Sequence, residues 1–388
     1  MSTTAPKGFR AAGVAAGLKA TGAPDVALVV NDGPDATAAG VFTTNRVKAA
    51  PVLWTQQVLR GGFLRAVVLN AGGANACTGP QGFQDTHATA EFVAAKVSSG
   101  RLHLGAADVA VCSTGLIGER LPMPRLLAGV DAAARALSRD GGPAAAEAIR
   151  TTDTRAKTTV VEGQGWCVGG MAKGAGMLAP GLATMLCLLT TDAVADASAL
   201  DAALRKATAA TFDRVDSDGC QSTNDTVLLL ASGASGRSPS DEELTAAVTA
   251  ACADLARQLL ADAEGSTKDI TIAVVGADSE RDALTVGRAV ARNNLVKTAL
   301  FGNDPNWGRI LAAVGTTDAA FEPDEVDVAI NGVWICRGGA AAEDRSKVDL
   351  TGRAVTITID LGAGPATATI WTNDLSLAYV HENSAYST

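Results

Sequence analysis

Short apolar runs recur along the first half of the chain and are separated by longer, alanine-rich stretches. The runs cover residues 26–30, 66–69 and 109–111, a length typical of buried strands. Residues 86–97 and 124–138 have the composition and length of helices. This alternation predicts a mixed α/β fold in which helices cover the faces of β-sheets.

The second half of the chain continues the pattern. Residues 184–190 and 226–230 are predicted to be strands, and residues 241–263 a long helix. Ser240 and Glu243 have the spacing of a capping box at the start of that helix.

Three further strands are predicted toward the C-terminus, over residues 270–275, 326–335 and 355–361. The segment ITIDLGAGPATATIWT has alternating residues on both sides of a turn at 362–365, which predicts an antiparallel pair joined by that turn. No solenoid repeat and no proline-rich linker divides the sequence.

Composition and charge narrow the class of protein. The chain has 388 residues, 47% hydrophobic and 19% charged, which is enough for a large core and two or three domains. A net charge of −9 without a basic block argues against a nucleic-acid partner. The sequence has no apolar run long enough for a membrane span and no export signal at its start, so we expect a cytoplasmic protein that does not bind membranes.

The usual metal ligands give no recognisable site in this sequence. His87, His103 and His381 are scattered, and no two cysteines form a CxxC pair. The acidic segment DRVDSDG at residues 213–219 lacks the glycine position and the closing glutamate of a calcium loop. We therefore expect a polar turn there, and neither a metal nor a bound cofactor.

The middle of the chain is dense in glycine just before an apolar strand. Residues 169–192 read GGMAKGAGMLAPGLATMLCLLTTD, with a Pro-Gly turn shortly before Thr184. A phosphate-binding loop would need a lysine followed at once by serine or threonine, whereas Lys173 is followed by Gly174. The pattern disfavours a nucleotide site and favours a bend that brings a hydroxyl group to the end of a strand.

Two interpretations of this bend stay open. In the first, the small Ala183 lets the Thr184 hydroxyl attack the preceding carbonyl, and hydrolysis of the ester frees an N-terminal threonine. The new α-amine, with a pKa of roughly 7.7–8.0, then serves as base for the adjacent hydroxyl. In the second, Thr184 is an ordinary strand residue beside glycines, because threonine favours strands.

The chain as a whole resembles the ornithine acetyltransferases. The segment KGAGMLAPGLATML at residues 173–186 is similar to the cleavage segment of that family. The similarity continues, in order along the chain, through LNAGGANACTG (69–79), CSTGLIGERLP (112–122), STNDTVLLL (222–230), LVKTALFGNDPNWGRI (295–310) and ENSAYST (382–388). Three positions depart from the family's common residues: Ala71, Gly73 and Gly181.

The resemblance implies a fold and a processing event. The fold would have two packed β-sheets flanked by helices, of the self-cleaving N-terminal-nucleophile type. Cleavage between Ala183 and Thr184 would give an alpha chain of residues 1–183 and a beta chain of residues 184–388. The two chains would stay associated, and two of each would form a heterotetramer.

The resemblance also implies a reaction in arginine biosynthesis. Acetyl would pass from N2-acetyl-L-ornithine to L-glutamate by a ping-pong mechanism through an ester on Thr184, giving ornithine and N-acetylglutamate. Some members of the family also use acetyl-CoA to make N-acetylglutamate, and no residue here decides that question.

The resemblance assigns roles to named residues. Thr114 and Gly115 match the oxyanion hole, where a hydroxyl and a backbone N–H face the developing negative charge. The substrate contacts match Thr151, Lys173, Thr184, Glu264, Asn383 and Thr388. Lys173 suits a carboxylate, whereas Glu264 suits an ammonium group and could relay protons. Taken without the resemblance, Lys173 is a surface lysine, Glu264 a solvated helix-end charge and residues 383–388 a frayed tail.

Two other functions remain open at this point. An N-terminal-nucleophile aminopeptidase or amidase would pass the acyl group to water instead of glutamate. An uncleaved small-molecule-binding protein would keep the bond between residues 183 and 184 intact.

Overall fold

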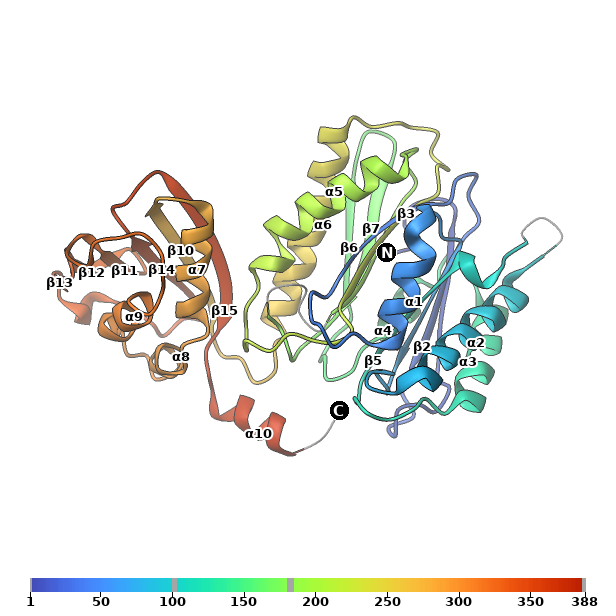
Figure 1. Cartoon of the computed structure of the whole chain (residues 1–388), viewed down its shortest axis with the longest axis horizontal. Coiled ribbons are helices and arrows are strands. Elements are labelled where there is room, and N and C mark those ends of the chain that lie inside the picture. The colour runs from blue at the N-terminus through green and yellow to red at the C-terminus, as the bar shows by residue number, and fades with distance from the viewer. Residues whose placement is uncertain (1, 100–102, 180–184, 386–388) are drawn as a thin grey trace.

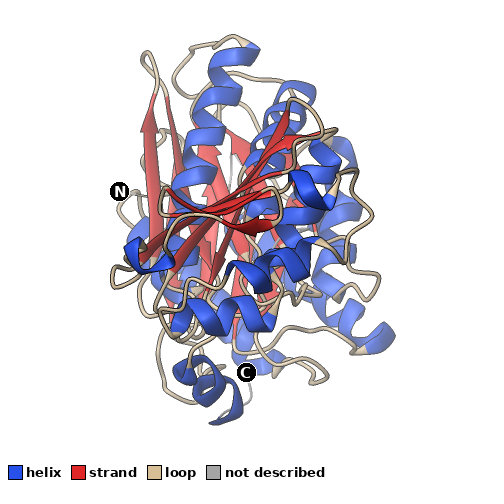
Figure 2. Ribbon diagram, turned by 90° about the vertical axis from the view of Figure 1, so that its left-hand side faces the viewer, coloured by secondary structure: helices blue, strands red, loops and turns tan. Residues whose placement is uncertain are grey.

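The computed structural model describes residues 2–99, 103–179 and 185–385, and these form three β-sheets surrounded by helices (Figures 1 and 2). Two of the sheets lie in a larger lobe, and the third lies in a smaller lobe built from the C-terminal part of the chain (Figure 1).

The first sheet has the strand order β1-β2-β4-β5. Its strands are β1 (Phe9–Val14), β2 (Val26–Asn31), β4 (Ala66–Ala71) and β5 (Val109–Thr114). The helices over its outer face are α1 (Ala50–Val58), α2 (Gly79–Val97) and α3 (Met123–Ala136), which pack on the buried side chains of Leu28, Val68 and Val111.

The second sheet has the order β3-β9-β8-β7-β6. Its strands are β3 (Thr37–Phe42), β9 (Thr226–Ala231), β8 (Leu186–Thr191), β7 (Cys167–Lys173) and β6 (Lys157–Glu162). Its outer face is covered by α5 (Ala197–Ala210) and α6 (Asp241–Ala261). The short helix α4 (Gly142–Ala148) packs against β1 and adds to the core between the two sheets.

Strand alternation explains why these two sheets pack face to face. Leu186 and Leu188 of β8 share one buried cluster with Val67 and Leu69 of the first sheet. Cys187 and Leu189 point the other way and join the cluster of α5 and α6, because successive side chains of a strand face opposite sides. The predicted arrangement of two packed sheets between helices is confirmed.

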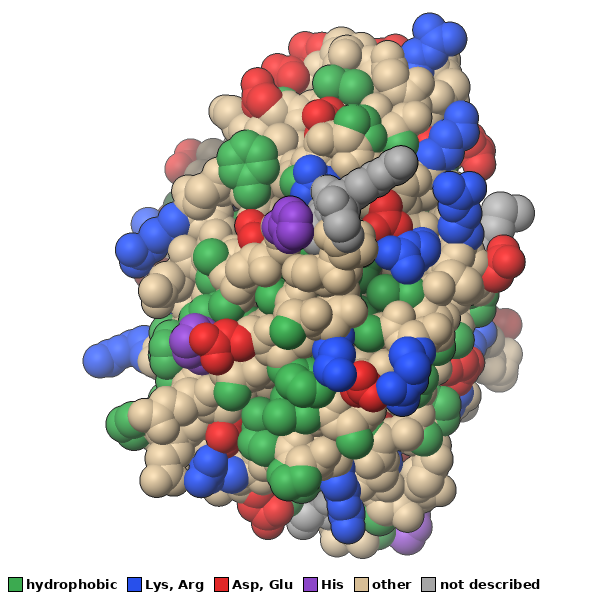
Figure 3. Space-filling view, turned by 90° about the vertical axis from the view of Figure 1, so that its right-hand side faces the viewer, with side chains coloured by type: hydrophobic (Ala, Val, Ile, Leu, Met, Phe, Trp, Pro, Cys, Tyr) green, Lys and Arg blue, Asp and Glu red, His purple; other side chains and the backbone are tan. Residues whose placement is uncertain are grey.

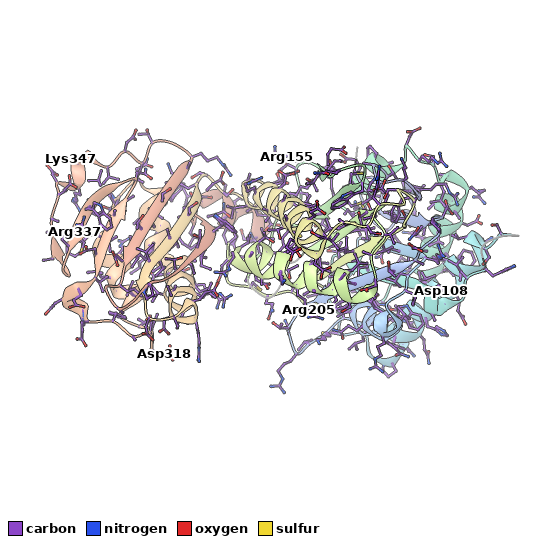
Figure 4. All side chains as sticks on the ribbon, turned by 90° about the horizontal axis from the view of Figure 1, so that it is seen from above. Asp108, Arg155, Arg205, Asp318, Arg337 and Lys347 are labelled. Carbon is purple, nitrogen blue, oxygen red and sulfur yellow. The ribbon has the colours of Figure 1, made fainter. Side chains whose placement is uncertain are left out.

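The third sheet adds a lobe that the sequence had not indicated as separate. Its order is β13-β12-β11-β14-β10-β15. The strands are β10 (Asp269–Ala277), β11 (Asp327–Ile330), β12 (Val333–Arg337), β13 (Ala340–Ala341), β14 (Ala354–Asp360) and β15 (Ala366–Asn373). They pack on the helices α7 (Glu280–Ala291), α8 (Asn294–Phe301) and α9 (Trp307–Val314). These strands and helices enclose an apolar core of their own. Seen from above, Arg337 and Lys347 lie in this lobe, far from Asp108 in the other (Figure 4). The lobe follows α6, so the predicted boundary at 183/184 comes in chain order between β7 and β8 of the second sheet and not between the lobes.

Two details of the third sheet contradict the sequence predictions. The antiparallel pair across residues 362–365 is wrong, because β10 lies between β14 and β15 and pairs with both, parallel to one and antiparallel to the other. The loop therefore spans two strand spacings, about 10 Å, instead of one. The single strand over 326–335 is also wrong: the chain reverses at Asn331 and Gly332, whose φ angles of 48° and 81° fit a tight Asn-Gly hairpin.

The predicted long helix and its cap are confirmed in α6. The Ser240 hydroxyl accepts from the Glu243 amide, and the Glu243 carboxylate accepts from the Ser240 amide. By length and apolar character alone α6 could cross a membrane, but Leu244, Leu255 and Leu259 are buried against the second sheet. We therefore interpret α6 as a core helix of the larger lobe.

On the face that Figure 3 shows, the described basic side chains stand among acidic ones.

The packing of the two sheets predicts a large cost for truncating a side chain between them. We expect Leu188→Ala to reduce the free energy of unfolding by about 2–5 kcal/mol, because a fully buried leucine leaves a cavity that its neighbours fill only in part. Urea unfolding followed by tryptophan fluorescence measures the change. The exposed Leu377 is the control, and Leu377→Ala should shift stability by less than about 0.5 kcal/mol.

Candidate active site

One pocket collects chain segments that are far apart in sequence, at the ends of β5 and β7. The described residues assigned to the site by resemblance all line it: Thr114, Gly115, Thr151, Lys173, Glu264 and Asn383. The remaining lining residues, which the sequence did not single out, are Ala74, Ile117, Thr152, Gly176, Met177, Ser222 and Asn224.

The proposed cleavage pair and one proposed substrate contact lie outside the described residues. These are Ala183, Thr184 and Thr388. On the C-terminal side of the cleavage segment, Met185 is buried and its amide donates to Asp225 Oδ1 over 3.1 Å. Burial raises the pKa of the Asp225 carboxyl group well above its ordinary value.

Lys173 is the last residue of β7, and its side chain is buried between the two sheets. Its Nζ donates to Thr114 Oγ1, on the last residue of β5, over 3.2 Å. The interpretation of Lys173 as a surface lysine is thereby excluded. Burial lowers the pKa of the Lys173 ammonium, and the negative charge of Asp153 opposes that shift.

The Lys173 ammonium retains capacity to bind an anion. An ammonium group has three donors, and among the described residues only the Thr114 hydroxyl accepts a hydrogen bond from it. Because Thr114 Oγ1 accepts from Lys173, its own proton is free to point toward another acceptor. Both groups could thus donate to a negatively charged ligand atom.

The turn after Thr114 is fixed by backbone contacts. The Thr114 carbonyl accepts from the amides of Gly72 and Gly73, each over 3.0 Å. Gly115 has a φ of 127°, and a Cβ atom there would come within 2.6 Å of the Gly73 nitrogen. Only glycine fits this position without displacing the neighbouring loop.

A buried polar network holds that neighbouring loop in place. The Ser113 hydroxyl donates to Asn70 Oδ1 over 2.6 Å, and Asn70 Nδ2 donates to the Gly73 carbonyl. Asn224 Nδ2 donates to the carbonyls of Ala74 and Ser113 over 2.7 and 2.8 Å. Gly73, one of the positions that depart from the common residues of the similar family, therefore lies beside the pocket. It is more than a hundred residues from Thr184 along the chain.

Glu264 enters the pocket from the turn after α6. Its Oε1 accepts from the Thr152 hydroxyl over 2.7 Å, and its backbone amide donates to the Ala175 carbonyl over 2.9 Å. A Cβ atom on Gly176 would approach Glu264 Oε2 to 2.7 Å, so the glycine permits this close contact. Glu264 is half-buried and held in place, which contradicts its interpretation as a solvated helix-end charge.

Asn383 lies at the rim of the pocket on α10 (Leu377–Ala385). Its Nδ2 donates to the Tyr379 carbonyl one helical turn earlier. The start of α10 is tied to the Glu264 turn, because the Ser376 hydroxyl donates to the Gly265 carbonyl. The described part of the terminal motif is therefore helical and not a frayed tail.

The acidic segment at 213–219 has structural partners. Asp216 accepts from Arg292 over 2.7 Å, and Asp218 accepts from the Cys220 amide over 3.1 Å. Within residues 2–99, 103–179 and 185–385, no three His, Cys, Asp or Glu side chains are grouped so as to hold a metal ion.

Several pocket residues escaped the sequence reasoning. Thr152 stands next to the predicted Thr151 but could not be distinguished from it, because a turn can present either hydroxyl. Asn224 belongs to the STNDT segment that carries part of the resemblance, but no role was predicted for its side chain. Asp153, which is buried and is not on the pocket wall, was also missed, because the Gly174 amide that donates to it lies 21 residues further along the chain and no sequence pattern predicts that contact.

Comparisons with known proteins agree on one family. Residues 10–388 match the ArgJ family. The chain is 66% identical over 387 residues to the arginine biosynthesis bifunctional protein ArgJ of Streptomyces avermitilis, covering 100% of both. It is 61% identical over 387 residues to ArgJ of Mycobacterium tuberculosis, covering 99% of this chain and 96% of that protein. The crystal structure of the ornithine acetyltransferase of M. tuberculosis complexed with ornithine is 63% identical, with a TM-score of 0.46, and covers 48% of this chain and 96% of its own.

The contact at Gly115 predicts that an added methyl group disturbs the pocket. We expect Gly115→Ala to lower stability by about 1–3 kcal/mol, because it combines a left-handed φ with a clash against the Gly73 amide. Thermal unfolding measures the loss.

Gly118 supplies the matched control for this substitution. Its φ is 92°, but no atom lies within 4 Å of the place that a Cβ would occupy, so Gly118→Ala carries the backbone strain without the clash. Equal losses in the two variants would contradict the role assigned to the contact with Gly73.

Proposed function

Because the chain belongs to the ArgJ family, we propose that it transfers the acetyl group of N2-acetyl-L-ornithine to L-glutamate in arginine biosynthesis. One observation carries the proposal: a single pocket holds a buried lysine ammonium, a fixed glutamate carboxylate and a threonine–glycine turn. This combination suits an amino-acid ligand with charges of both signs and a carbonyl that becomes negative during reaction.

The two charged side chains would orient the substrate. Acetylornithine carries an α-carboxylate at one end and a δ-ammonium group at the other. Lys173, which among the described residues donates only to Thr114, is the proposed partner of the carboxylate. Glu264, fixed by Thr152, is the proposed partner of the ammonium group. Thr151 and Asn383, also on the pocket wall, would complete the polar contacts.

The nucleophile would be made by self-cleavage. The Thr184 hydroxyl attacks the Ala183 carbonyl, the peptide nitrogen leaves as an amine, and water hydrolyses the resulting ester. The products are a carboxylate at Ala183 and a free α-amine at Thr184. That amine, with an ordinary pKa of roughly 7.7–8.0, is the base that the hydroxyl otherwise lacks.

Acetyl transfer then takes two steps. The Thr184 oxygen attacks the acetyl carbonyl while its proton passes to the amine, and the Thr114 hydroxyl and the Gly115 N–H stabilise the oxyanion. Collapse of this intermediate breaks the amide bond, and the leaving ornithine nitrogen takes the proton. Glutamate next attacks the acetyl ester with its amine, which forms N-acetylglutamate and restores the threonine. No cofactor enters either step, although acetyl-CoA is a possible second donor in this scheme.

Strand pairing supports a cleaved but associated product. β7 and β8 are antiparallel neighbours, paired from Val168 with Thr191 to Lys173 with Leu186. Cutting between residues 183 and 184 opens their connection without removing these hydrogen bonds. The two chains are thus expected to remain one unit, and the cytoplasmic heterotetramer remains our prediction for its assembly.

Substitution of the proposed nucleophile tests the cleavage and the chemistry together. We expect Thr184→Ala to abolish both self-cleavage and acetyl transfer, because the attacking hydroxyl is lost. Thr184→Ser, which keeps a hydroxyl, should retain part of each. Denaturing gels and intact-mass spectrometry report cleavage, and ornithine release from acetylornithine plus glutamate reports transfer.

Four outcomes would contradict the proposal in different ways. Cleavage in Thr184→Ala would show that another group attacks. Acetate release that does not depend on glutamate would favour the aminopeptidase or amidase alternative. Full activity in uncut protein would remove the need for a new N-terminus, and uncut wild type without activity would favour a binding protein.

The proposed substrate contacts predict a loss that cleavage alone cannot explain. We expect Lys173→Met and Glu264→Gln each to lower kcat/KM for acetylornithine about 10- to 100-fold, because each removes one charged hydrogen bond. The variants are assayed as co-expressed chains 1–183 and 184–388, so that slow maturation does not mask the effect. Lys96→Met, at a surface ion pair with Asp131, is the control and should be unaffected.

A further inference from the structure

Behind the pocket lies a buried ion network that the proposed mechanism does not use. The Lys157 Nζ donates to Asp153 Oδ1 and to Asp262 Oδ2, each over 2.6 Å. The side chains of Lys157 and Asp153 are 0% exposed and that of Asp262 is 5% exposed. We call these three residues the buried triad.

Asp153 ties together two segments of the pocket wall. Its Oδ1 also accepts from the Gly174 amide over 2.7 Å, directly after Lys173. Its Oδ2 accepts from the Thr151 amide over 3.0 Å. Burial by itself would raise the pKa of Asp153, but the charges of Lys173 and Lys157 outweigh it and lower that pKa to about 2. The carboxylate therefore stays ionised and keeps these contacts at every ordinary pH.

Asp262 does the same for the segment that carries Glu264. Its two oxygens accept from the amide and the hydroxyl of Thr154, the amide over 3.0 Å. Asp262 precedes Glu264 by two residues, and Thr152 in turn donates to Glu264. Lys157 thus connects, through one carboxylate on each side, the chain at Lys173 with the chain at Glu264.

Two members of the triad have no direct route to a ligand at the pocket, and the third, Asp262, lines only the neighbouring cavity that shares Thr152 and Glu264 with it. Lys157 and Asp153 are absent from its wall, and both are closed to solvent. Any effect they have on the reaction must pass through the residues they hold. A buried ion pair is also a weak source of net stability, because desolvation offsets most of the attraction. A positioning role accounts for the triad better than stabilisation does.

We propose that the buried triad of Asp153, Lys157 and Asp262 sets the distance between the ammonium of Lys173 and the carboxylate of Glu264, and thereby the length of diamino acid that the pocket accepts. The inference deepens the proposed function and rests on it. If Lys173 binds the α-carboxylate and Glu264 binds the side-chain ammonium, their separation selects the number of methylene groups between the two. Loosening the triad should then relax the choice between acetylornithine and its neighbours in chain length.

The test compares substrates that differ by one methylene. N2-acetyl-L-ornithine is assayed beside N2-acetyl-L-lysine, which is one methylene longer, with glutamate as acceptor. Asp262→Asn keeps the shape of the side chain but removes one charge from the triad. We expect the KM for acetylornithine to rise about tenfold, kcat to change less than about threefold, and the preference for acetylornithine over acetyllysine to fall at least about fivefold.

Further variants separate positioning from folding. Lys157→Arg keeps the charge but places a larger, planar head group between the two carboxylates, so its selectivity should fall below that of the wild type and stay above that of Asp262→Asn. Lys157→Met leaves two buried carboxylates without their cation and is expected to impair folding. Lys268→Met is the matched control, because Lys268 is a buried lysine whose ammonium holds the carbonyls of Leu350 and Gly352 in the smaller lobe. It should lower the melting temperature without changing the substrate preference.

The possible results are distinct. A folded, cleaved Asp262→Asn with unchanged KM and unchanged preference overturns the inference, as does a change no larger than that of Lys268→Met. If Asp262→Asn does not fold, Lys157→Arg decides, because selectivity identical to wild type in a protein of lowered stability also overturns it. If the wild type does not transfer acetyl to glutamate, the proposed function is contradicted instead of this inference. The wild type is therefore assayed before any variant is compared with it.

Discussion

The burial of one ammonium group, that of Lys173, between two apolar sheets is the constraint on which the site depends. An ion taken out of water is destabilised by several kcal/mol unless polar partners replace the solvent. Thr114 supplies one such partner from the first sheet, and Asp153 supplies negative charge from the loop before β6. Each of these groups has to be fixed in turn, which is why the pocket is surrounded by backbone hydrogen bonds and glycines at positions where a side chain would collide.

The same sandwich explains how the chain could tolerate being cut at its centre. The apolar faces of β7 and β8 are buried on both sides, and the strands are paired with each other and with further strands at their outer edges. A covalent link between two such strands contributes little to their association once the sheet has formed. The connection at this place can therefore be used for chemistry without endangering the fold.

The smaller lobe contributes to the site through its connections to the larger one. Glu264 lies on the turn that leads from α6 into β10, and Asn383 lies on the helix that follows β15. Across the junction of the lobes, Lys297 Nζ donates to the Ser217 carbonyl over 2.7 Å, and Arg292 pairs with Asp216. These contacts fix the smaller lobe against the larger one, so that one wall of the pocket depends on both.

The sequence by itself determined several elements, among them the strand at 226–230 and the helix α6 with its cap, because strand alternation and capping depend on residues close together in the chain. It also placed Thr114, Lys173 and Glu264 among the candidates, although only through resemblance to a family. Tertiary structure alone decided what joins them. The insertion of β10 between β14 and β15, the burial of Lys173 and the triad around Lys157 all bring together residues distant in sequence. Such contacts form when segments from distant parts of the chain compete for burial and for hydrogen bonds. A local sequence pattern does not predict which segments will pair.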